Sequence, residues 1–269
     1  MNPRFQNLLL AAYRALLHTG LLETRPGYAV FERVYDLYKA TLEASSLRHV
    51  RDYVRPGTRV VDVGAHVGFF TQRFAAWVGP EGRVIALEPE PVNFGRLVRR
   101  LRRTGFSSRV EAINAAAVEA SGSYFLRVDP SHPGDHQLAT DGLPVPGIAL
   151  DRLVEHHDRR PISLMKIDVQ GAEARVLTGA EETIRRFRPS LLVEVDDGRL
   201  RRQGSSAEGL LGLLASLSYT PQHLTRSGLS RVLGIAEAVD IAGGLGRYAD
   251  FLFAGGNVPT YSLGTTPRP

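Results

Sequence analysis

The sequence predicts an α/β protein with a Rossmann-like, mostly parallel seven-stranded sheet, helices on both of its faces and additional N-terminal helices. Three observations support this fold class. Short β-branched runs alternate with amphipathic helical segments. The run Arg59–Val63 leads through the glycine-spaced turn Gly64–Gly68 into an apolar helical segment, as in doubly wound sheets. Three of the runs end in an acid, at Glu88, Asp168 and Glu194, and such folds bind ligands at the carboxyl ends of their strands.

Length and composition fit one large globular domain. The 269 residues are 43% hydrophobic and 23% charged, which is ordinary for a globular enzyme with a sizeable core. We expect an N-terminal helical cap over residues 1–55, the main domain over 56–256 and a loose tail over 257–269. The absence of cysteine excludes a disulfide framework, a thiolate metal site and a cysteine nucleophile.

The chain is basic, with a net charge of +5 and a pI of about 9.7. Lysine occurs only at Lys39 and Lys166, so nearly all of the 33 basic residues are arginine. Clusters such as Arg99–Arg103 and Arg185–Arg188 alternate with apolar residues or lie beside acids. We interpret them as solvated faces of helices rather than as a surface for nucleic acid.

The N-terminal residues predict helices. An apolar stripe at i, i+3 and i+4 spacing over residues 4–17 indicates an amphipathic helix, and a second helical segment covers about Val30–Tyr53. We expect these helices to pack over the ligand edge of the sheet, to close as a lid or to form a homodimer contact. No stretch approaches the roughly 18 apolar residues of a transmembrane helix, and no cleavage site marks a signal peptide. The expected location is therefore cytoplasmic.

The remaining elements follow from the same patterns. Up to residue 128 they are a helix over Phe69–Val78, a strand over Arg83–Leu87, a helix over Pro91–Arg103, a strand over Val110–Asn114 and a hairpin arm over Tyr124–Val128. Beyond residue 147 they are a short helix after Ile148–Leu153, a strand over Ile162–Val169, a helix over Ala174–Arg186, a strand over Leu191–Val195, a helix over Ala207–Leu217, a strand over Tyr219–Leu224 and a last edge strand over Phe251–Phe253.

The segment Asp129–Pro146 between these two groups is rich in Pro, Gly, Asp and His, and it is too polar for a core strand. Loops of this length are often functional, so it is either a solvent-exposed loop or a substrate loop. Its side chains His132, Asp135 and His136 could bind a metal ion, but no helical pattern fixes their spacing.

The turn after the first strand has the form of a nucleotide-type cofactor site. Gly64 lets the backbone turn tightly against a ligand, and Gly68 lets the helix pack close to the strand. The Gly-x-x-x-Gly spacing differs from the Gly-x-Gly-x-x-Gly of dinucleotide sites, and an ordinary strand-to-helix turn is the alternative interpretation. Glu88, at the end of the second strand, occupies the position that holds ribose hydroxyls in such folds.

Taken together, these motifs resemble the FkbM-type branch of class I S-adenosylmethionine-dependent methyltransferases. The resemblance covers roughly residues 58–196, and it implies a class I methyltransferase fold. Its most specific part is Lys166-Ile167-Asp168-Val169 with Gly171-Ala172-Glu173. The other matching stretches are Val61–Gly68, Leu87–Pro89 with Asn93, Leu150–Asp151, Val176–Leu177, Gly179–Ala180 and Pro189–Glu194. The family more often has Glu where this chain has Gln170.

The resemblance implies that S-adenosylmethionine is the cofactor. Its methionyl part would lie beside the Gly64–Gly68 turn, its ribose hydroxyls at Glu88 and its adenine between Asn114 and Ala115. The residues expected to bind the cofactor are Asp62, Gly64, Ala65, His66, Gly68, Phe69, Glu88, Pro89, Asn93, Asn114, Ala115 and Asp168.

The implied reaction is methylation of a hydroxyl on a small molecule such as a sugar, a polyketide or another secondary metabolite. An alcohol is a weak acid, so a general base must accept its proton or a divalent cation must polarise its oxygen. Asp168 is the first candidate for the reacting centre, with Glu194 and His136 as further catalytic candidates. If the reaction depends on a metal, Asp168, Glu194 and Asp196 could hold Mg²⁺. Glu173 would either act there or stabilise the start of its helix.

Three other functions compete with this one. The arginine clusters favour an RNA methyltransferase, but the chain lacks both an Asn/Asp-Pro-Pro-aromatic motif and a cysteine for attack on a pyrimidine. A partner protein could bind S-adenosylmethionine without catalysing a reaction. The glycine spacing disfavours a nicotinamide-dependent dehydrogenase.

Overall fold

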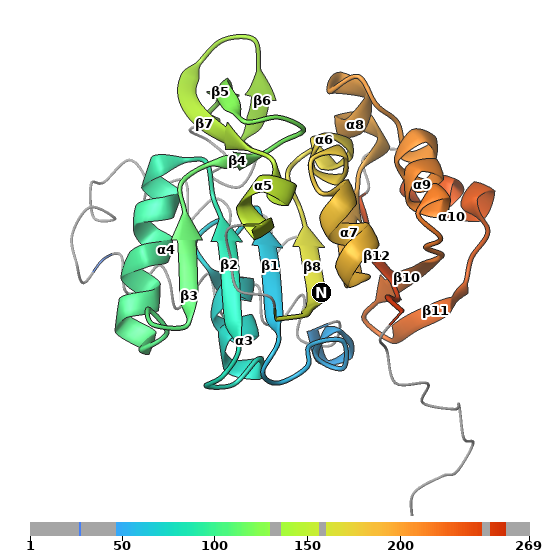
Figure 1. The fold of residues 1–269 in the computed structure, drawn as a ribbon. Coiled ribbons are helices and arrows are strands. Elements are labelled where there is room, and N and C mark those ends of the chain that lie inside the picture. The colour runs from blue at the N-terminus through green and yellow to red at the C-terminus, as the bar shows by residue number, and fades with distance from the viewer. Residues whose placement is uncertain (1–26, 28–46, 130–135, 156–159, 244–247, 257–269) are drawn as a thin grey trace, which may run out of the picture.

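The computed structural model describes residue 27 and residues 47–129, 136–155, 160–243 and 248–256 (Figure 1). Most of the expected N-terminal cap, and with it the expected homodimer contact, lies outside these residues, as do His132, Asp135 and the expected tail. The strands of the main sheet are β1 (Arg59–Val63), β2 (Arg83–Leu87), β3 (Val110–Ile113), β8 (Ile162–Ile167), β9 (Ser190–Val195), β10 (Pro221–Thr225), β11 (Gly228–Val232) and β12 (Ala249–Phe253).

The main sheet is Rossmann-like but mixed. In the described residues it has eight strands in the order β11-β10-β12-β9-β8-β1-β2-β3. The five strands from β9 to β3 pair in parallel, whereas β12, β10 and β11 pair antiparallel with their neighbours. The strand β11 is the addition to the seven strands that we expected. The α/β fold class is thus confirmed, with a larger antiparallel part than predicted.

The expectation that Phe251–Phe253 forms an edge strand is wrong. These residues belong to β12, which lies inside the sheet between β9 and β10. All three side chains are fully buried. Successive side chains of a strand point to opposite faces, so an unbroken apolar run is typical of a strand that is covered on both sides.

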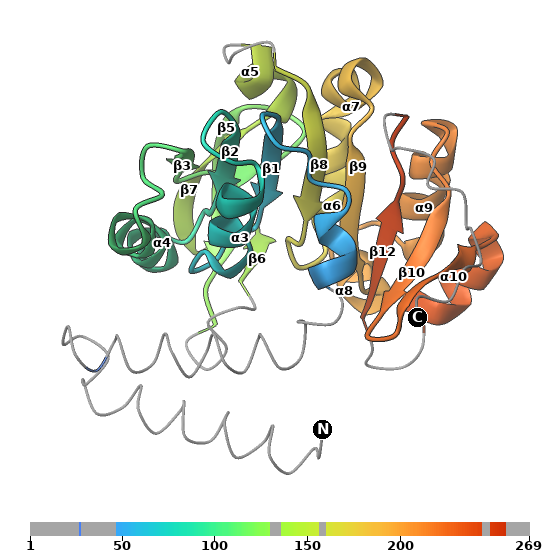
Figure 2. The same ribbon diagram turned by 90° about the horizontal axis from the view of Figure 1, so that it is seen from below.

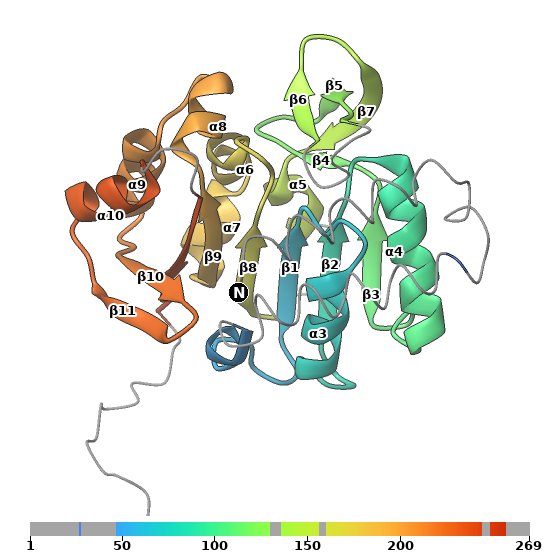
Figure 3. The same ribbon diagram turned by 180° about the vertical axis from the view of Figure 1, so that it is seen from behind.

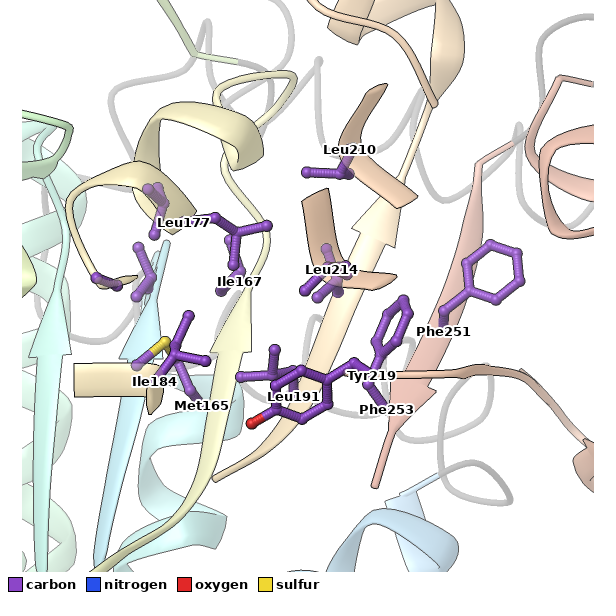
Figure 4. Close-up of a cluster of buried hydrophobic side chains, with 14 of the residues drawn as sticks. Met165, Ile167, Leu177, Ile184, Leu191, Leu210, Leu214, Tyr219, Phe251 and Phe253 are labelled. Carbon is purple, nitrogen blue, oxygen red and sulfur yellow. The ribbon is translucent and has the colours of Figure 1, made fainter. Parts of the chain in front are cut away.

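Helices cover both faces of the sheet (Figures 1, 2 and 3). The helices α3 (Phe69–Trp77) and α4 (Pro91–Thr104) pack on one face. The opposite face carries α5 (Leu150–Glu155), α6 (Glu173–Thr178), α7 (Glu181–Phe187), α9 (Ala207–Ser216) and α10 (Ile235–Ala242). The alternation along β1 explains both cores, because Val60 packs with α3 and α4 whereas Val61 and Val63 pack toward the second group. Figure 4 shows part of this second core.

The predicted helix Ala174–Arg186 is two helices, α6 and α7. The chain bends at Gly179, where an added Cβ would lie only 2.0 Å from the carbonyl oxygen of Val118. Glycine therefore lets this turn pass close to the neighbouring backbone, at the cost of a continuous helix. The short elements α8 (Asp197–Arg202), α10 and β11 were not predicted. No helix in the described part of the chain combines the length and apolar composition that a membrane crossing needs.

The segment that we expected to be a loop contributes to a second sheet. This sheet has the order β4-β7-β5-β6, made of β4 (Ala116–Ala117), β5 (Gly122–Arg127), β6 (Gln137–Ala139) and β7 (Leu143–Ile148). It lies above the carboxyl ends of the central strands (Figure 1). Leu126, Leu138 and Val145 form its small core, so alternate apolar residues stabilise strands within a polar sequence. The prediction of β5 as a hairpin arm is confirmed, because it pairs antiparallel with β6 and β7.

Candidate active site

A cleft opens where β1, β2 and β8 end, and it encloses about 1020 Å³ including its open mouth. Strands and loops that are distant in the sequence meet there, as expected for the carboxyl edge of a parallel sheet. The expected cofactor residues that line it are Gly64, Ala65, His66, Phe69, Glu88, Pro89, Asn93, Ala115 and Asp168. Three expected cofactor residues, Asp62, Gly68 and Asn114, lie behind this lining.

The glycines of the β1–α3 turn are required by their surroundings. Gly64 has φ +77°, and an added Cβ would lie 1.9 Å from the carbonyl oxygen of Asp168. Gly68 has φ +86°, and an added Cβ there would lie 2.6 Å from Leu97 Cδ1 on α4. Gly64 therefore lets β1 approach the end of β8, while Gly68 lets α3 start against α4. Of the two, only Gly64 lines the cleft.

Glu88 is buried at the end of β2 with its carboxylate held by backbone donors. The N–H of His66 donates to Oε2 at 2.8 Å, and the N–H of Glu90 donates to Oε1 at 3.0 Å. Burial raises the pKa of Glu88 to about 7, and these two hydrogen bonds act in the opposite direction. Each carboxylate oxygen has a second lone pair, so the group is fixed in place and can still accept hydroxyl donors from the cleft.

Two asparagines support the end of β2 in different ways. Asn114 Nδ2 donates to the carbonyl oxygens of Glu88 and Pro89 at 2.9 and 3.0 Å, so it braces the backbone from behind the cleft. Asn93 lines the cleft from the first turn of α4 and is almost fully buried. Its backbone N–H donates to the N-cap residue Glu90 at 2.7 Å.

Lys166 connects the buried interior to the cleft, and sequence reasoning did not select it as a site residue. Its Nζ lies 3.6 Å from Asp62 Oδ1 and 3.2 Å from Asp168 Oδ2, and it donates to the carbonyl oxygen of Gly64 at 3.4 Å. The available signal was its position: a lysine within the largely apolar run Ile162–Ile167, in a chain whose basic residues are nearly all arginine.

Asp62 is a structural member of this group. It is fully buried, and Thr71 Oγ1 donates to its Oδ2 at 2.6 Å. Burial raises its pKa, and Lys166 is the strongest influence in the opposite direction. Asp62 therefore fixes the end of β1 to α3 and to Lys166, and it does not reach the cleft.

The turn after β8 orients Asp168. Gln170 has φ +59°, lines the cleft and donates from Nε2 to Asp168 Oδ1 at 3.2 Å. Glu173 is buried behind this turn, where its Oε1 accepts the backbone N–H groups of Val169 and Gly171 at 3.2 and 3.1 Å. Burial raises the pKa of Glu173 to about 7. Of its two expected roles, the structure favours the structural one at the start of α6.

Glu194 and His136 reach the cleft from separate elements. Glu194, at the end of β9, lines it, and Arg199 Nη1 lies 3.1 Å from Glu194 Oε1. Burial, followed by the charges of Asp168 and Asp250, raises its pKa well above the ordinary value. His136 lines the cleft just before β6, and its Nδ1 accepts the N–H of Asp129 at 3.3 Å.

The three carboxylates proposed for Mg²⁺ do not assemble into a site. Asp196 is the N-cap of α8, where its Oδ1 accepts the N–H of Arg199 at 3.0 Å, and it does not line the cleft. Within the described residues, no group of three or more His, Asp or Glu side chains is placed to share a metal ion. Helix capping thus accounts for the acid that follows β9.

Comparison with known proteins identifies the family. Residues 62–221 match the family model described as the methyltransferase FkbM domain. The protein-L-isoaspartate O-methyltransferase of Triticum aestivum is 34% identical over 102 residues, which are 36% of this chain and 40% of that protein. The 2-O-methyltransferase NoeI of Sinorhizobium fredii is 28% identical over 201 residues, which are 66% of this chain and 81% of that protein.

A solved FkbM methyltransferase from Methylobacillus flagellatus superposes with a TM-score of 0.46 and 19% identity, covering 73% of this chain and 43% of that one. The chain spans between 40% and 60% of the length of the first curated relatives that it matches. The family match begins within β1, at residue 62, and includes the whole of β2, β8 and β9, the other strands that carry the cleft. The chain therefore belongs to the FkbM family of S-adenosylmethionine-dependent methyltransferases.

Proposed function

We propose that this protein transfers a methyl group from S-adenosylmethionine to a hydroxyl of a small molecule such as a sugar, a polyketide or another secondary metabolite. The observation that carries the proposal is one continuous cleft with two chemically different parts. Glu88 on β2 lines it together with Asp168 on β8 and Glu194 on β9. A group for binding a ribose and a group for accepting a proton are thus available in the same cavity.

The residues of the cleft fit the cofactor. Gly64 has no Cβ, which lets the end of β8 lie against this turn, because an added Cβ would be 1.9 Å from the carbonyl oxygen of Asp168. The fixed carboxylate of Glu88 would accept the ribose hydroxyls. Small residues, Ala115–Ala117, form a flat apolar wall that suits an adenine ring. The positively charged part of the cofactor would face Asp168.

When bound, S-adenosylmethionine supplies an electrophilic methyl group on a sulfonium. The protein must orient the acceptor hydroxyl and remove its proton. Lys166 and Gln170 both donate to Asp168, which stabilises its ionised form, so we assign it to orientation and to electrostatic support. We assign the base to Glu194, because burial and Asp168 raise its pKa toward the range in which a carboxylate accepts protons effectively. His136 is the alternative base.

Calorimetric titration with S-adenosylhomocysteine, with NAD⁺ as the control ligand, tests the cofactor assignment. We expect micromolar binding of S-adenosylhomocysteine and none of NAD⁺. Glu88→Gln should weaken that binding by about tenfold or more, since hydrogen bonds to charged groups contribute about 1.5–3 kcal/mol. Glu111→Gln, an exposed acid on the neighbouring strand β3, is the matched control and should leave the affinity unchanged.

Transfer itself is tested with S-adenosylmethionine carrying a deuterated methyl group and a panel of sugars and polyketides. Mass spectrometry should detect one labelled methyl group on an acceptor oxygen. Binding of NAD⁺ in place of S-adenosylhomocysteine, or a label found only on nitrogen or carbon, would refute the proposal. Repeating the assay with a chelator and then with added Mg²⁺ determines whether a metal contributes.

A further inference from the structure

A second cavity adjoins the cleft. Phe70, Lys166, Asp168 and Glu194 line both spaces. The rest of the second cavity is bounded by residues 47–50 and by β10 and β12, and Tyr248 and Asp250 belong to its lining. The two cavities therefore meet at the carboxylates to which the proposed function assigns the reacting centre.

Asp250 lies directly opposite Glu194 in the antiparallel pair of β12 and β9. Side chains at such a position share one face of the sheet, about 4.5–5.5 Å apart between Cβ atoms, and like charges there destabilise a sheet. Asp250 also contributes to the raised pKa of Glu194, after burial and Asp168. Arg199, 3.1 Å from Glu194, offsets part of this repulsion, and three carboxylates still line the second cavity where it joins the cleft.

We propose that the second cavity binds the methyl acceptor, and that Asp250 selects a neutral or amino-bearing sugar against an anionic one. This inference rests on the proposed methyl transfer. Displacement at the methyl group is in-line, so the acceptor oxygen must approach from the side away from the sulfur, through a space that shares the reacting carboxylates with the cofactor cleft. The second cavity meets that requirement at Asp168 and Glu194.

The chemistry of the lining defines the acceptor. Three carboxylates, Asp168, Glu194 and Asp250, and one ammonium group, Lys166, line the second cavity. An ionised carboxylate accepts hydrogen bonds and donates none, so this acidic lining favours vicinal hydroxyls or an ammonium group over a carboxylate. Tyr248 is 57% exposed and offers an aromatic face beside them. An uncharged or amino-bearing pyranose satisfies both features, whereas a uronic acid would place like charges together.

The absence of cysteine from the chain permits a direct test of this charge preference. Tyr248→Cys introduces a single thiol at the cavity. Val232→Cys is the control: Val232 lies on β11, its side chain is 52% exposed, and it does not line the cavity. The quantity measured is the ratio of the labelling rate with a cationic methanethiosulfonate to the rate with an anionic one. This ratio should be about tenfold or more higher at Tyr248→Cys than at Val232→Cys. Adding Asp250→Asn should bring the ratio close to the control value. Equal ratios at both sites would overturn the proposal.

Protection by ligands tests the acceptor. With S-adenosylhomocysteine present, methyl glucoside and glucosamine should slow the labelling of Tyr248→Cys, and glucuronic acid should not. Protection by glucuronic acid equal to that by the other sugars would refute the acceptor assignment. Failure of both methyl glucoside and glucosamine to bind the wild-type complex with S-adenosylhomocysteine in calorimetry, where Tyr248 is intact, would refute it as well. Calorimetry on the wild-type protein and on Asp250→Asn separates the two proposals. Absence of S-adenosylhomocysteine binding to the wild-type protein refutes methyl transfer itself, whereas intact binding with unselective labelling refutes only the acceptor site.

Discussion

Lys166 Nζ lies 3.2 Å from Asp168 Oδ2, and the same ammonium group lies 3.6 Å from the fully buried Asp62. The side chain of Lys166 is only 4% exposed, and this one cation offsets both the buried Asp62 and Asp168, which is 27% exposed at the cleft. The wall of the cleft therefore depends on Lys166, because its removal would leave both carboxylates without this cation.

The first prediction concerns this group. Lys166→Met should lower the free energy of unfolding by about 3–5 kcal/mol, because it leaves Asp62 and Asp168 without their cation. The matched control is Arg127→Met, which removes the cation of the exposed pair Arg127–Asp141 and should cost about 0–1 kcal/mol. Urea denaturation followed by circular dichroism measures both. A loss for Lys166→Met no larger than for the control would contradict the assigned role.

The second prediction concerns the coupling of Asp168 to Glu194. Burial raises the pKa of Glu194 first and the charge of Asp168 second, so Asp168→Asn should lower the pKa of Glu194. The same substitution should reduce turnover by about 10²–10³-fold with little change in cofactor affinity, since it removes a charge that supports the reacting centre.

Carboxyl-carbon NMR titration of glutamate-labelled protein measures this pKa without an acceptor. Glu88 is the internal control. Lys166 and Glu90 contribute to the shift of its pKa, but Asp168 does not, so the pKa of Glu88 should stay at about 7 in the variant. An unchanged titration of Glu194 would remove Asp168 from its surroundings. A variant that retained most of its turnover would remove Asp168 from the reacting centre.

The third prediction concerns pH and stability. Folding raises the pKa of Glu173 from 4.5 to about 7, because it is buried. The protonated form is therefore favoured in the folded state, and the stability that it contributes is present below pH 4.5 and is lost as the pH rises through 7. For one titrating group, a pKa difference of this size between the folded and unfolded states corresponds to a loss of about 3 kcal/mol in the free energy of unfolding.

Glu173→Gln should consequently flatten the fall in unfolding free energy between about pH 5 and 8, and it should leave the variant at least as stable as the wild-type protein at pH 8. Glu208→Gln, an exposed acid in the first turn of α9, should leave the slope unchanged. Chemical denaturation at four or five pH values gives the slope. A variant with the wild-type slope would show that Glu173 does not titrate in this range.

The sequence predicted the parts of the fold that depend on local pattern. The strand Arg59–Val63, its glycine turn and the acids that end β2, β8 and β9 all lie where expected, because strand burial and turn chemistry are written in consecutive residues. The interior position of β12 could not be read, since strand order depends on which surfaces meet after long connections. The strand β6 was missed because it has only three residues, and β7 was missed because it contains two prolines and a glycine, which are uncommon inside strands.

The site was predicted unevenly for similar reasons. Acids at the carboxyl ends of strands, such as Glu88 just after β2 and Glu194 as the next-to-last residue of β9, line the cleft as expected. Asp62 is the next-to-last residue of β1 and Asn114 directly follows β3, yet neither residue lines the cleft. Side chains near a strand end alternate between the two faces, so position in the sequence alone does not place them. The contact of Lys166 with Asp62, and the pairing of Glu194 with Asp250, join residues from different strands, so only the folded arrangement reveals them.

The last prediction separates backbone strain from cavity shape at the glycine turn. Gly64 and Gly79 have similar positive φ angles of +77° and +72°, but an added Cβ would lie 1.9 Å from the carbonyl oxygen of Asp168 at the first and near no atom within 4 Å at the second. Gly79→Ala should therefore cost only the strain of the left-handed conformation, about 1–2 kcal/mol. Gly64→Ala must also push β1 away from the end of β8, so it should cost more than this and abolish measurable binding of S-adenosylhomocysteine.

Denaturation and calorimetry on both variants decide the matter. If Gly64→Ala bound the ligand as tightly as Gly79→Ala does, the turn would not form part of the cofactor site. If the two variants were equally stable, the close approach of β1 to Asp168 would not be required by the fold. Loss of binding only in Gly64→Ala, with both proteins folded, would tie the missing side chain at this position to the space that the cofactor needs.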